Sequence, residues 1–317
     1  EQFVRALADV QHFFPAAKFS FQSGYIYNHL NYINKISGIN SENDVNSSLN
    51  NLLFSYLGIS DLLIDAKVSY DYHNVRSNNY EGLKTRSHAS VSVGLNYSGI
   101  ECLKLNVVLR QEYIDNNTAP FTPSIAARYQ PFDNEKLFIK ASAARNFHAP
   151  TLNDLYWSPG GNPNLKNETG LSFDFGFSYG KNIQKVDVKA DLTCFYSDIE
   201  NRIIWLPDSV FSYWTPSNLR NVISQGVEAS LHLEGQISGI DLNYDLNYSF
   251  TSARNINTVS SNDQSINKQL IYIPQNMLQQ TAGIGYSGFL AGYRFNMTGK
   301  RYTTSDNLRY LPHFTVQ

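Results

Sequence analysis

Apolar and polar residues alternate along most of the chain with a period of two. In residues 240–251, an apolar or aromatic side chain occupies each even position and a polar side chain each odd position. The same alternation occurs in residues 64–72, 171–179 and 186–196. Successive side chains of a β-strand point to opposite faces, so this pattern indicates strands with one apolar face. No segment shows a convincing helical stripe, and we therefore predict an all-β protein.

Strands of this kind fit either a soluble sandwich or a membrane barrel whose apolar face meets lipid. The expected strands are about 10–17 residues long, which exceeds the mean of about 5–6 residues in soluble proteins. Short connections are expected near residues 11–15, 60–61, 99–102, 131–135, 181–185, 234–239 and 287–289. Longer ones are expected near residues 33–46, 74–86, 116–120, 146–166, 204–217, 255–269 and 302–311. Short turns that alternate with long loops are typical of outer-membrane barrels.

Tyrosines also gather near the ends of the expected strands, as in the aromatic girdles of outer-membrane barrels. Examples are Tyr25, Tyr27, Tyr70, Tyr72, Tyr97, Tyr113, Tyr196 and Tyr248. The length of the expected strands, the alternation of short and long connections, and the tyrosines at strand ends together predict a transmembrane antiparallel β-barrel. The pattern predicts about 14 strands and the start of a fifteenth after Leu311, whereas bacterial barrels close with an even number. We interpret the chain as part of a larger barrel, with a complete 14-strand barrel as the alternative.

Composition agrees with a barrel and excludes two other classes. Charged residues make up 16% of the 317 residues and hydrophobic residues 42%, whereas a soluble domain has about 25% charged residues. Uncharged polar residues, above all Asn, fill the gap and disfavour a helical bundle. The formal net charge of −2 provides no basic field that would attract nucleic acid.

One segment is more specific than the strand pattern. Residues 145–169 read Arg-Asn-Phe-His-Ala-Pro-Thr-Leu-Asn-Asp-Leu-Tyr-Trp-Ser-Pro-Gly-Gly-Asn-Pro-Asn-Leu-Lys-Asn-Glu-Thr. This run resembles the signature of TonB-dependent outer-membrane receptors, R-x-F-x-x-P-T-L-x-[DE]-L-Y followed by G-N-P-x-L-x-x-E. The matching residues are Arg145, Phe147, Pro150, Thr151, Leu152, Asp154, Leu155, Tyr156, Gly161, Asn162, Pro163, Leu165 and Glu168. Weaker similarity at 221–228, 272–274 and 301–312 extends the resemblance from residue 136 to residue 317.

The resemblance implies that residues 1–317 form part of the receptor barrel, equivalent to roughly strands six to twenty of a 22-strand barrel. The plug domain, its TonB-binding segment and the terminal strands would then lie outside this chain. The implied location is the outer membrane. The implied partners are outer-membrane lipid, the receptor's own plug domain, the TonB complex acting through that plug, and a surface lipoprotein.

The implied function is TonB-energised uptake of a large, scarce ligand. The Leu-Tyr-Trp-x-Pro-Gly-Gly-Asn-Pro form of the motif most resembles the cobalamin-receptor branch, as seen in Bacteroidetes. A siderophore or haem receptor of the same family is the alternative, and a passive porin-like barrel is the alternative from another class.

Aromatic residues in the expected external loops are the candidate ligand-binding residues, because rigid amphipathic rings suit bulky ligands. With one neighbouring amide, the set is Tyr156, Trp157, Asn162, Phe211, Tyr213 and Trp214. The alternative is that residues 147–166 form a scaffold loop that only closes one strand pair. Arg145, Glu228 and Arg294 are candidate lumen residues that would face the plug, and purely structural charges on a hydrated wall are the alternative.

The sequence predicts no enzyme, resident cofactor or metal site. Gly283–Gly288 matches G-x-G-x-x-G, but it lies in an expected strand and turn without a following helix. The chain contains no HExxH motif, nucleophile elbow or phosphate loop. His148 and Asp154 are the only nearby pair expected at the rim, and an outer-membrane hydrolase built on them is the enzymatic alternative.

Overall fold

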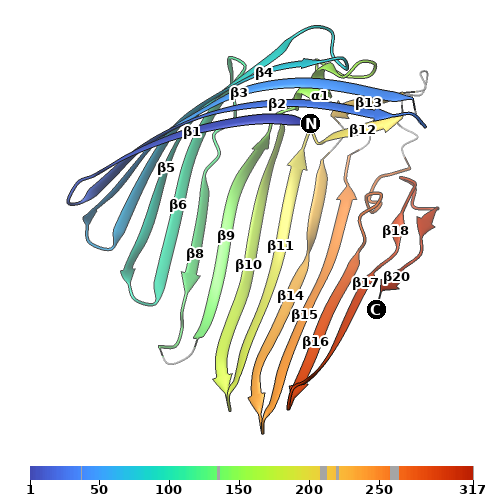
Figure 1. Cartoon of the computed structure of the whole chain (residues 1–317). Coiled ribbons are helices and arrows are strands. Elements are labelled where there is room, and N and C mark those ends of the chain that lie inside the picture. Colours follow the sequence, from blue (N-terminus) through green and yellow to red (C-terminus); the bar gives the residue numbers. More distant parts are fainter. Residues whose placement is uncertain (37, 134–135, 208–212, 219–220, 258–263, 317) are drawn as a thin grey trace.

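The computed structural model describes residues 1–36, 38–133, 136–207, 213–218, 221–257 and 264–316 (Figure 1). Most of them belong to one antiparallel sheet that bends into a trough (Figure 1). Its strands are β1 (Gln2–Phe13), β2 (Ala17–Asn34), β3 (Ile39–Ile59), β4 (Leu62–Ser77), β5 (Lys84–Ile100), β6 (Leu103–Ile114), β7 (Asn117–Thr118), β8 (Ser124–Tyr129), β9 (Lys136–His148), β10 (Glu168–Ile183), β11 (Val186–Glu200), β14 (Val222–Ile237), β15 (Ile240–Asn255), β16 (Asn276–Tyr286), β17 (Phe289–Thr298) and β20 (Phe314–Val316).

The strands lie side by side in their order along the chain, from β1 at one edge to β20 at the other. The sheet has 16 strands, and because the two-residue β7 lies off the main path, 15 of them form the wall. This confirms the expected 14 strands and the start of a fifteenth. Within the described residues β1 and β20 do not pair, so the trough is open along one side.

The smaller elements lie between the wall strands. They are the helix α1 (Leu152–Tyr156) and two short hairpins, β12 (Ile203–Pro207) with β13 (Trp214–Asn218) and β18 (Arg301–Tyr302) with β19 (Tyr310–Leu311). No helix in the described part of the chain is long and apolar enough to cross a membrane.

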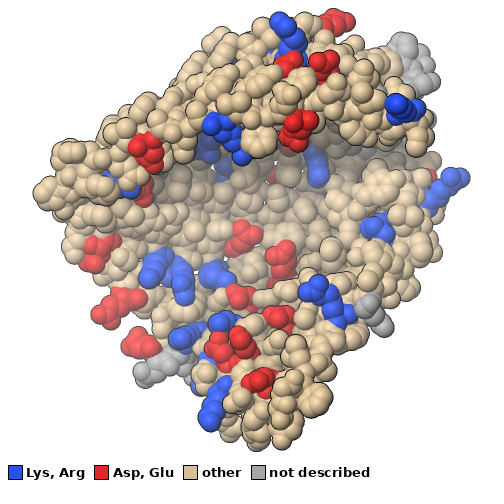
Figure 2. All heavy atoms as spheres, viewed as in Figure 1, with Lys and Arg blue, Asp and Glu red and all other residues tan. Residues whose placement is uncertain are grey.

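The two faces of the wall differ as the alternation predicts. On β10, Phe173, Phe175 and Phe177 are 48%, 49% and 41% exposed on the outer face. Asp174 and Ser178 alternate with them on the inner face, and charged side chains gather over the hollow of the trough (Figure 2). Large apolar side chains that point outward and polar ones that point inward are the arrangement of a barrel in lipid. Buried hydrophobic residues of the described chain, such as Val222 and Ala253, lie near strand ends rather than in a central core.

Tight turns close one end of the trough. Gln184-Lys185, Ser238-Gly239 and Ser287-Gly288 each have two residues with positive φ. Two-residue turns of this kind match the right-handed twist of antiparallel strands. The longer connections lie at the opposite end, which we call the rim, so the predicted alternation of connections is largely confirmed.

One predicted long connection is wrong. Residues 33–46 are not a loop, because β2 and β3 pair continuously from Ala17 opposite Tyr56 to Asn34 opposite Ile39. A strand crosses a membrane with about 9–11 residues, whereas β3 has 21. The part of the β2–β3 hairpin near the rim therefore extends beyond the membrane, where both faces meet water. Polar residues occupy both faces there, and the period of two is lost although the strand continues.

Candidate functional site at the rim

The receptor-like motif forms the connection between β9 and β10, residues 149–167, which we call the motif loop. Its helix α1 begins with a capping box in which Thr151 is the N-cap residue. Oδ2 of Asp154 accepts hydrogen bonds from the Thr151 backbone N–H at 2.8 Å and from the Thr151 hydroxyl at 2.7 Å. The Asp154 N–H donates back to Thr151 Oγ1 at 3.1 Å. The first turn of a helix leaves amide groups without partners, and these bonds satisfy them. A helix of only five residues can therefore form at this point.

The Asp154 carboxylate also connects the motif loop to a distant hairpin. It is buried, and its second oxygen, Oδ1, accepts a hydrogen bond from the Trp205 indole N–H of β12 at 2.8 Å. A buried carboxylate needs such partners, because an unpaired one would carry a large desolvation cost. Both oxygens of this motif residue therefore have structural partners.

A second set of bonds joins the motif loop to the β4–β5 connection, residues 78–83. The Tyr80 hydroxyl donates to Asn153 Oδ1, and the Ser158 N–H donates to the Asn79 carbonyl oxygen at 2.8 Å. At the start of β5, Arg86 donates from Nη1 to the Pro150 carbonyl oxygen at 2.6 Å. Burial raises the pKa of the Tyr80 phenol above its ordinary value, so this hydroxyl stays a donor at neutral pH.

The β12–β13 hairpin contacts the other half of the motif loop. The Asn162 side chain donates to the carbonyl oxygen of the fully buried Pro216 at 3.2 Å. Asn218 accepts from the Lys166 N–H at 2.6 Å and donates to the Lys166 carbonyl oxygen at 2.8 Å. The Glu168 carboxylate accepts from the Ile203 N–H at 2.6 Å. We call the motif loop, residues 78–83 and the β12–β13 hairpin the rim cluster.

The glycine pair of the motif is required by close backbone contacts. Gly160 has a φ of +122°, and a Cβ there would lie 2.3 Å from the Trp214 carbonyl oxygen. A Cβ on Gly161 would lie 2.5 Å from the Trp157 backbone nitrogen. Any other residue at these positions would displace the hairpin or the helix end. The motif therefore encodes the packing of the rim cluster.

The predicted ligand-binding residues divide into two groups in the structure. Tyr156 and Trp157 line a depression of about 360 Å³ beside the motif loop. Lys84 Nζ lies 4.4 Å from the centre of the Tyr156 ring, within the range of a cation–π contact. The amide of Asn162 is occupied by its bond to Pro216.

The remaining predicted residues lie in or near β13. Trp214 is 56% exposed, and the Tyr213 ring borders Gly160. Phe211 lies outside the described residues. The structure thus brings Tyr156, Trp157, Asn162, Tyr213 and Trp214 into one rim cluster, although they come from two connections.

A second cavity of about 250 Å³ lies at the rim between β12 and residues 265–273. It is lined by Ile204, Trp205 and Leu206 of β12, by Val222, and by Gln269 and Ile271, among others. The predicted ligand-binding set does not contain Trp205. Its indole partner Asp154 is 51 positions away in the sequence, so no local pattern indicates that Trp205 joins the motif.

The strand register shows on which face of the wall the predicted lumen residues lie. Glu228 lies opposite Thr193, and Arg294 lies opposite Thr281. Both therefore lie on the inner face with the other charges. The predicted inward orientation of Arg145 is wrong. Arg145 lies opposite Leu171, on the outer face that carries the β10 phenylalanines.

The sequence pattern places Arg145 at the end of an inward-facing run, whereas the β9–β10 register turns its side chain to the outer face. Its Nη1 lies 3.5 Å from the Phe121 carbonyl oxygen, so it contacts the neighbouring connection at the rim.

The pair considered for a hydrolase, His148 and Asp154, has separate partners in the structure. His148 Nδ1 lies 3.7 Å from the Glu168 carboxylate, and Asp154 is bound by Thr151 and Trp205 instead. A hydrolytic site needs a base, its orienting group and a nucleophile in mutual contact. The two residues proposed for that role have separate structural partners.

Comparison with known proteins identifies the class of barrel. A family model described as "TonB dependent receptor-like, beta-barrel" matches residues 5–316. The vitamin B12 transporter BtuB of Vibrio vulnificus is 43% identical over 89 residues, which are 28% of this chain and 14% of the transporter. The corresponding BtuB of Photobacterium profundum is 31% identical over 139 residues, 43% of this chain and 20% of the transporter.

Solved structures agree in fold at low sequence identity. The copper transporter OprC superposes with a TM-score of 0.73 at 15% identity, over 99% of this chain and 55% of OprC. The ferric enterobactin receptor PfeA of Pseudomonas aeruginosa gives 0.71 at 15% identity, over 99% of this chain and 53% of the receptor. The chain thus spans about half the length of these barrel proteins.

Proposed function

Because this chain belongs to the TonB-dependent receptor β-barrel family, a family of the outer membrane, we propose that it is part of a receptor that imports a corrinoid of the cobalamin type. In the proposed domain arrangement, this chain supplies the wall strands and the rim cluster described above to a larger barrel. The remaining strands and a plug domain lie elsewhere in the receptor, and the TonB complex acts through the plug.

The ligand proposal is carried by one observation. The sequence relatives that exceed 30% identity are both vitamin B12 transporters. The solved structures with copper or iron–siderophore ligands stay at 15% identity or below in the two cases compared, a level that supports a common fold alone. Ligand specificity lies in side chains at sites grafted on a fold, so the sequence relatives have more weight.

The rim cluster supports a bulky ligand with a flat ring. Trp157 and Tyr156 border one cavity and Trp205 borders another, while Trp214 is exposed beside them. Hydrogen bonds from the motif loop and the β12–β13 hairpin hold the backbone behind these rings. A site whose backbone is ordered before binding loses less conformational entropy on binding, which favours affinity.

The inner face supports passage of a hydrated ligand once the plug has moved. Charged and polar side chains line it, as the Lys140–Asp191 ion pair illustrates at 2.8 Å (Figure 2). Charges that face water in a barrel carry little energetic cost. We propose that this wall contacts the plug in the resting receptor.

Binding to the intact receptor tests the ligand class. We expect cyanocobalamin to bind to the purified receptor by calorimetry, and ferric enterobactin to give no heat of binding. Energised uptake in cells should stop when the proton-motive force is dissipated. Binding of the siderophore alone would contradict the corrinoid proposal, and uptake that persists without energy would indicate a passive porin.

Paired variants test the rim residues. Trp157→Ala combined with Trp214→Ala should lower cyanocobalamin affinity at least about tenfold, since aromatic anchors carry much of the binding energy in such sites. Phe132→Ala is the matched control, because Phe132 is an aromatic residue of similar exposure, 55% against 56% for Trp214, in the tight connection between β8 and β9 at the opposite end. Unchanged affinity in the double variant would remove both tryptophans from the site.

A further inference from the structure

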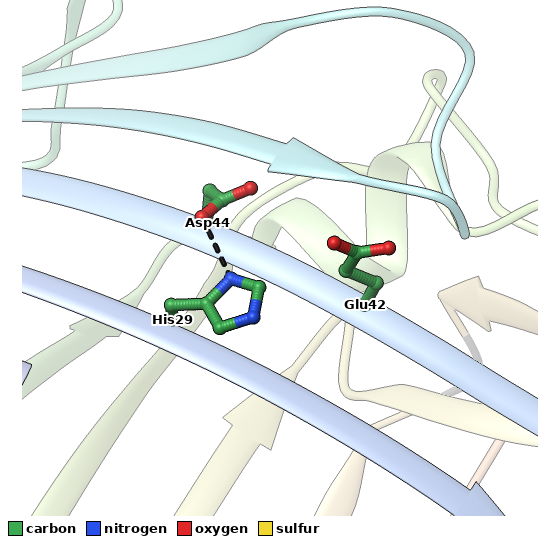
Figure 3. Close-up of side chains that lie close together, drawn as sticks. All are labelled: His29, Glu42 and Asp44. Carbon is green, nitrogen blue, oxygen red and sulfur yellow. Dashed lines mark hydrogen bonds and ion pairs between the residues drawn. The ribbon is translucent and has the colours of Figure 1, made fainter. Parts of the chain in front are cut away.

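Three potential metal ligands lie together on the outer face of the β2–β3 hairpin, in the part that extends beyond the membrane. His29 of β2 lies directly opposite Asp44 of β3, and Glu42 precedes Asp44 by two positions on the same face. Figure 3 shows the imidazole joined to the Asp44 carboxylate, with the Glu42 carboxylate to one side of the pair. One ligand atom from each residue lies within 4.8 Å of the other two.

Neighbouring residues hold two of these groups in place. His29 Nδ1 lies 2.9 Å from Asp44 Oδ1, and the Tyr27 hydroxyl donates to the same oxygen at 3.0 Å. These two contacts fix the position of the Asp44 carboxylate. Glu42 is fixed through its backbone, because its N–H donates to Asn78 Oδ1 at 2.9 Å.

The charge of the cluster is incompletely balanced. Among the described residues, the Glu42 carboxylate has no hydrogen-bond or ion-pair partner, and it lies beside a second carboxylate. Arg76 of β4 lies opposite Asp44 on the same face, so one arginine faces two carboxylates there. Two carboxylates this close repel each other unless a cation lies between them.

We propose that His29, Glu42 and Asp44 bind a divalent transition-metal ion of the zinc type on the outer surface of the barrel. One imidazole and two carboxylates are a ligand set that zinc accepts, whereas Mg²⁺ and Ca²⁺ prefer oxygen ligands alone. Zinc–ligand distances of about 2.0–2.2 Å require a modest closure of the present spacing. Glu42 can supply it by side-chain rotation, because only its backbone is tied down.

The site is separate from the proposed transport path. It lies on the outer face of the wall, whereas the ligand and the plug would contact the rim cluster and the inner face. Three protein ligands leave further coordination positions open toward solvent. Loss of this site and loss of corrinoid binding are therefore distinguishable outcomes.

Zinc titration of the untagged intact receptor tests the proposal. We expect Zn²⁺ to bind by calorimetry at one site that Glu42→Gln and His29→Gln each weaken at least about tenfold, because each variant removes a ligand. His148→Gln is the matched control, because His148 lies beside a single carboxylate, Glu168. Mg²⁺ should bind at least about a hundredfold more weakly than Zn²⁺.

Two results would overturn the proposal: unchanged Zn²⁺ affinity in Glu42→Gln, or equal affinity for Mg²⁺. Glu42→Gln is the decisive variant, because its side chain has no described bond whose loss could unfold the hairpin. Co²⁺ provides a second readout, since nitrogen and oxygen ligation at a low-coordinate site gives intense visible absorption bands. These bands should appear in the unaltered receptor and be lost in His29→Gln.

Discussion

The strand wall and the rim cluster are built by different rules. In the wall, each residue faces a partner on the adjacent strand, and strand parity decides whether it meets lipid or the lumen. In the rim cluster, the bonds from Asp154 to Trp205 and from Asn153 to Tyr80 join residues 51 and 73 positions apart. Apart from its tightly packed glycines, the wall should therefore tolerate substitutions that keep its polarity, whereas the rim cluster should respond to the loss of single atoms.

The largest expected effect is a charge on the outer face of the wall. Phe175 lies near the middle of β10 and is exposed on that face. Phe175→Arg should destabilise the folded barrel by about 2–4 kcal/mol, because a cation near the bilayer midplane is costly. Urea titration of the receptor folded into vesicles measures this difference.

The matched control is Ser230→Arg, which introduces the same cation on the inner face opposite Asp191. We expect it to change stability by less than about 1 kcal/mol. Equal losses from both variants would contradict the assignment of outer and inner faces.

A smaller and more local effect is expected at the motif acid. Asp154→Ala removes the capping box and leaves the Trp205 indole N–H without its acceptor. The rim cluster should lose about 2 kcal/mol of local stability, with little change in the wall. Hydrogen exchange of residues 152–166 should accelerate, whereas exchange in β10 and β11 should not.

Asp154→Asn separates shape from charge in the same position, since an amide oxygen can still accept from Trp205. We expect it to retain more protection than Asp154→Ala. A uniform acceleration of exchange over the wall and the motif loop would show that the two regions are one cooperative unit.

The smallest expected effect is on a lumen ion pair. Lys140 and Asp191 are 40% and 44% exposed while their charged atoms lie 2.8 Å apart. Lys140→Met should cost about 0.2–1 kcal/mol, because solvent screens an exposed pair. A larger loss of unfolding free energy in urea titration would show that this wall ion pair is as specific a contact as the hydrogen bonds of the rim cluster.

The sequence predicts the wall well, for a physical reason. Lipid outside and water inside impose opposite polarity on alternate residues, and that constraint is visible in each strand by itself. The alternation puts Glu228 and Arg294 on the inner face, and the register has them there; their contact with the plug stays a prediction. The same pattern misplaces Arg145 at the end of an inward-facing run, because the register has it on the outer face.

The rim could be predicted only in part. The prolines and glycines of residues 147–166 indicate a shaped connection, and the motif indicates its family. The partners of Asp154 and Asn162 come from a hairpin more than 50 positions away, so no local period encodes them. The metal ligands His29, Glu42 and Asp44 lie in a segment where strand polarity is lost, and only the register of β2 and β3 brings them together.

The sequential strand order has a consequence for how the protein acquires its structure. Every wall strand pairs with its nearest wall neighbours along the chain, and tight turns such as Ser238-Gly239 limit the loop that each hairpin must close. Short loops cost little entropy on closure, so contacts of this kind form fast. The wall can grow one hairpin at a time, whereas the bonds between the motif loop and the β12–β13 hairpin form only after residues 203–218 have followed β11. This order of contacts predicts that the wall strands of this chain pair before the β12–β13 side of the rim cluster closes.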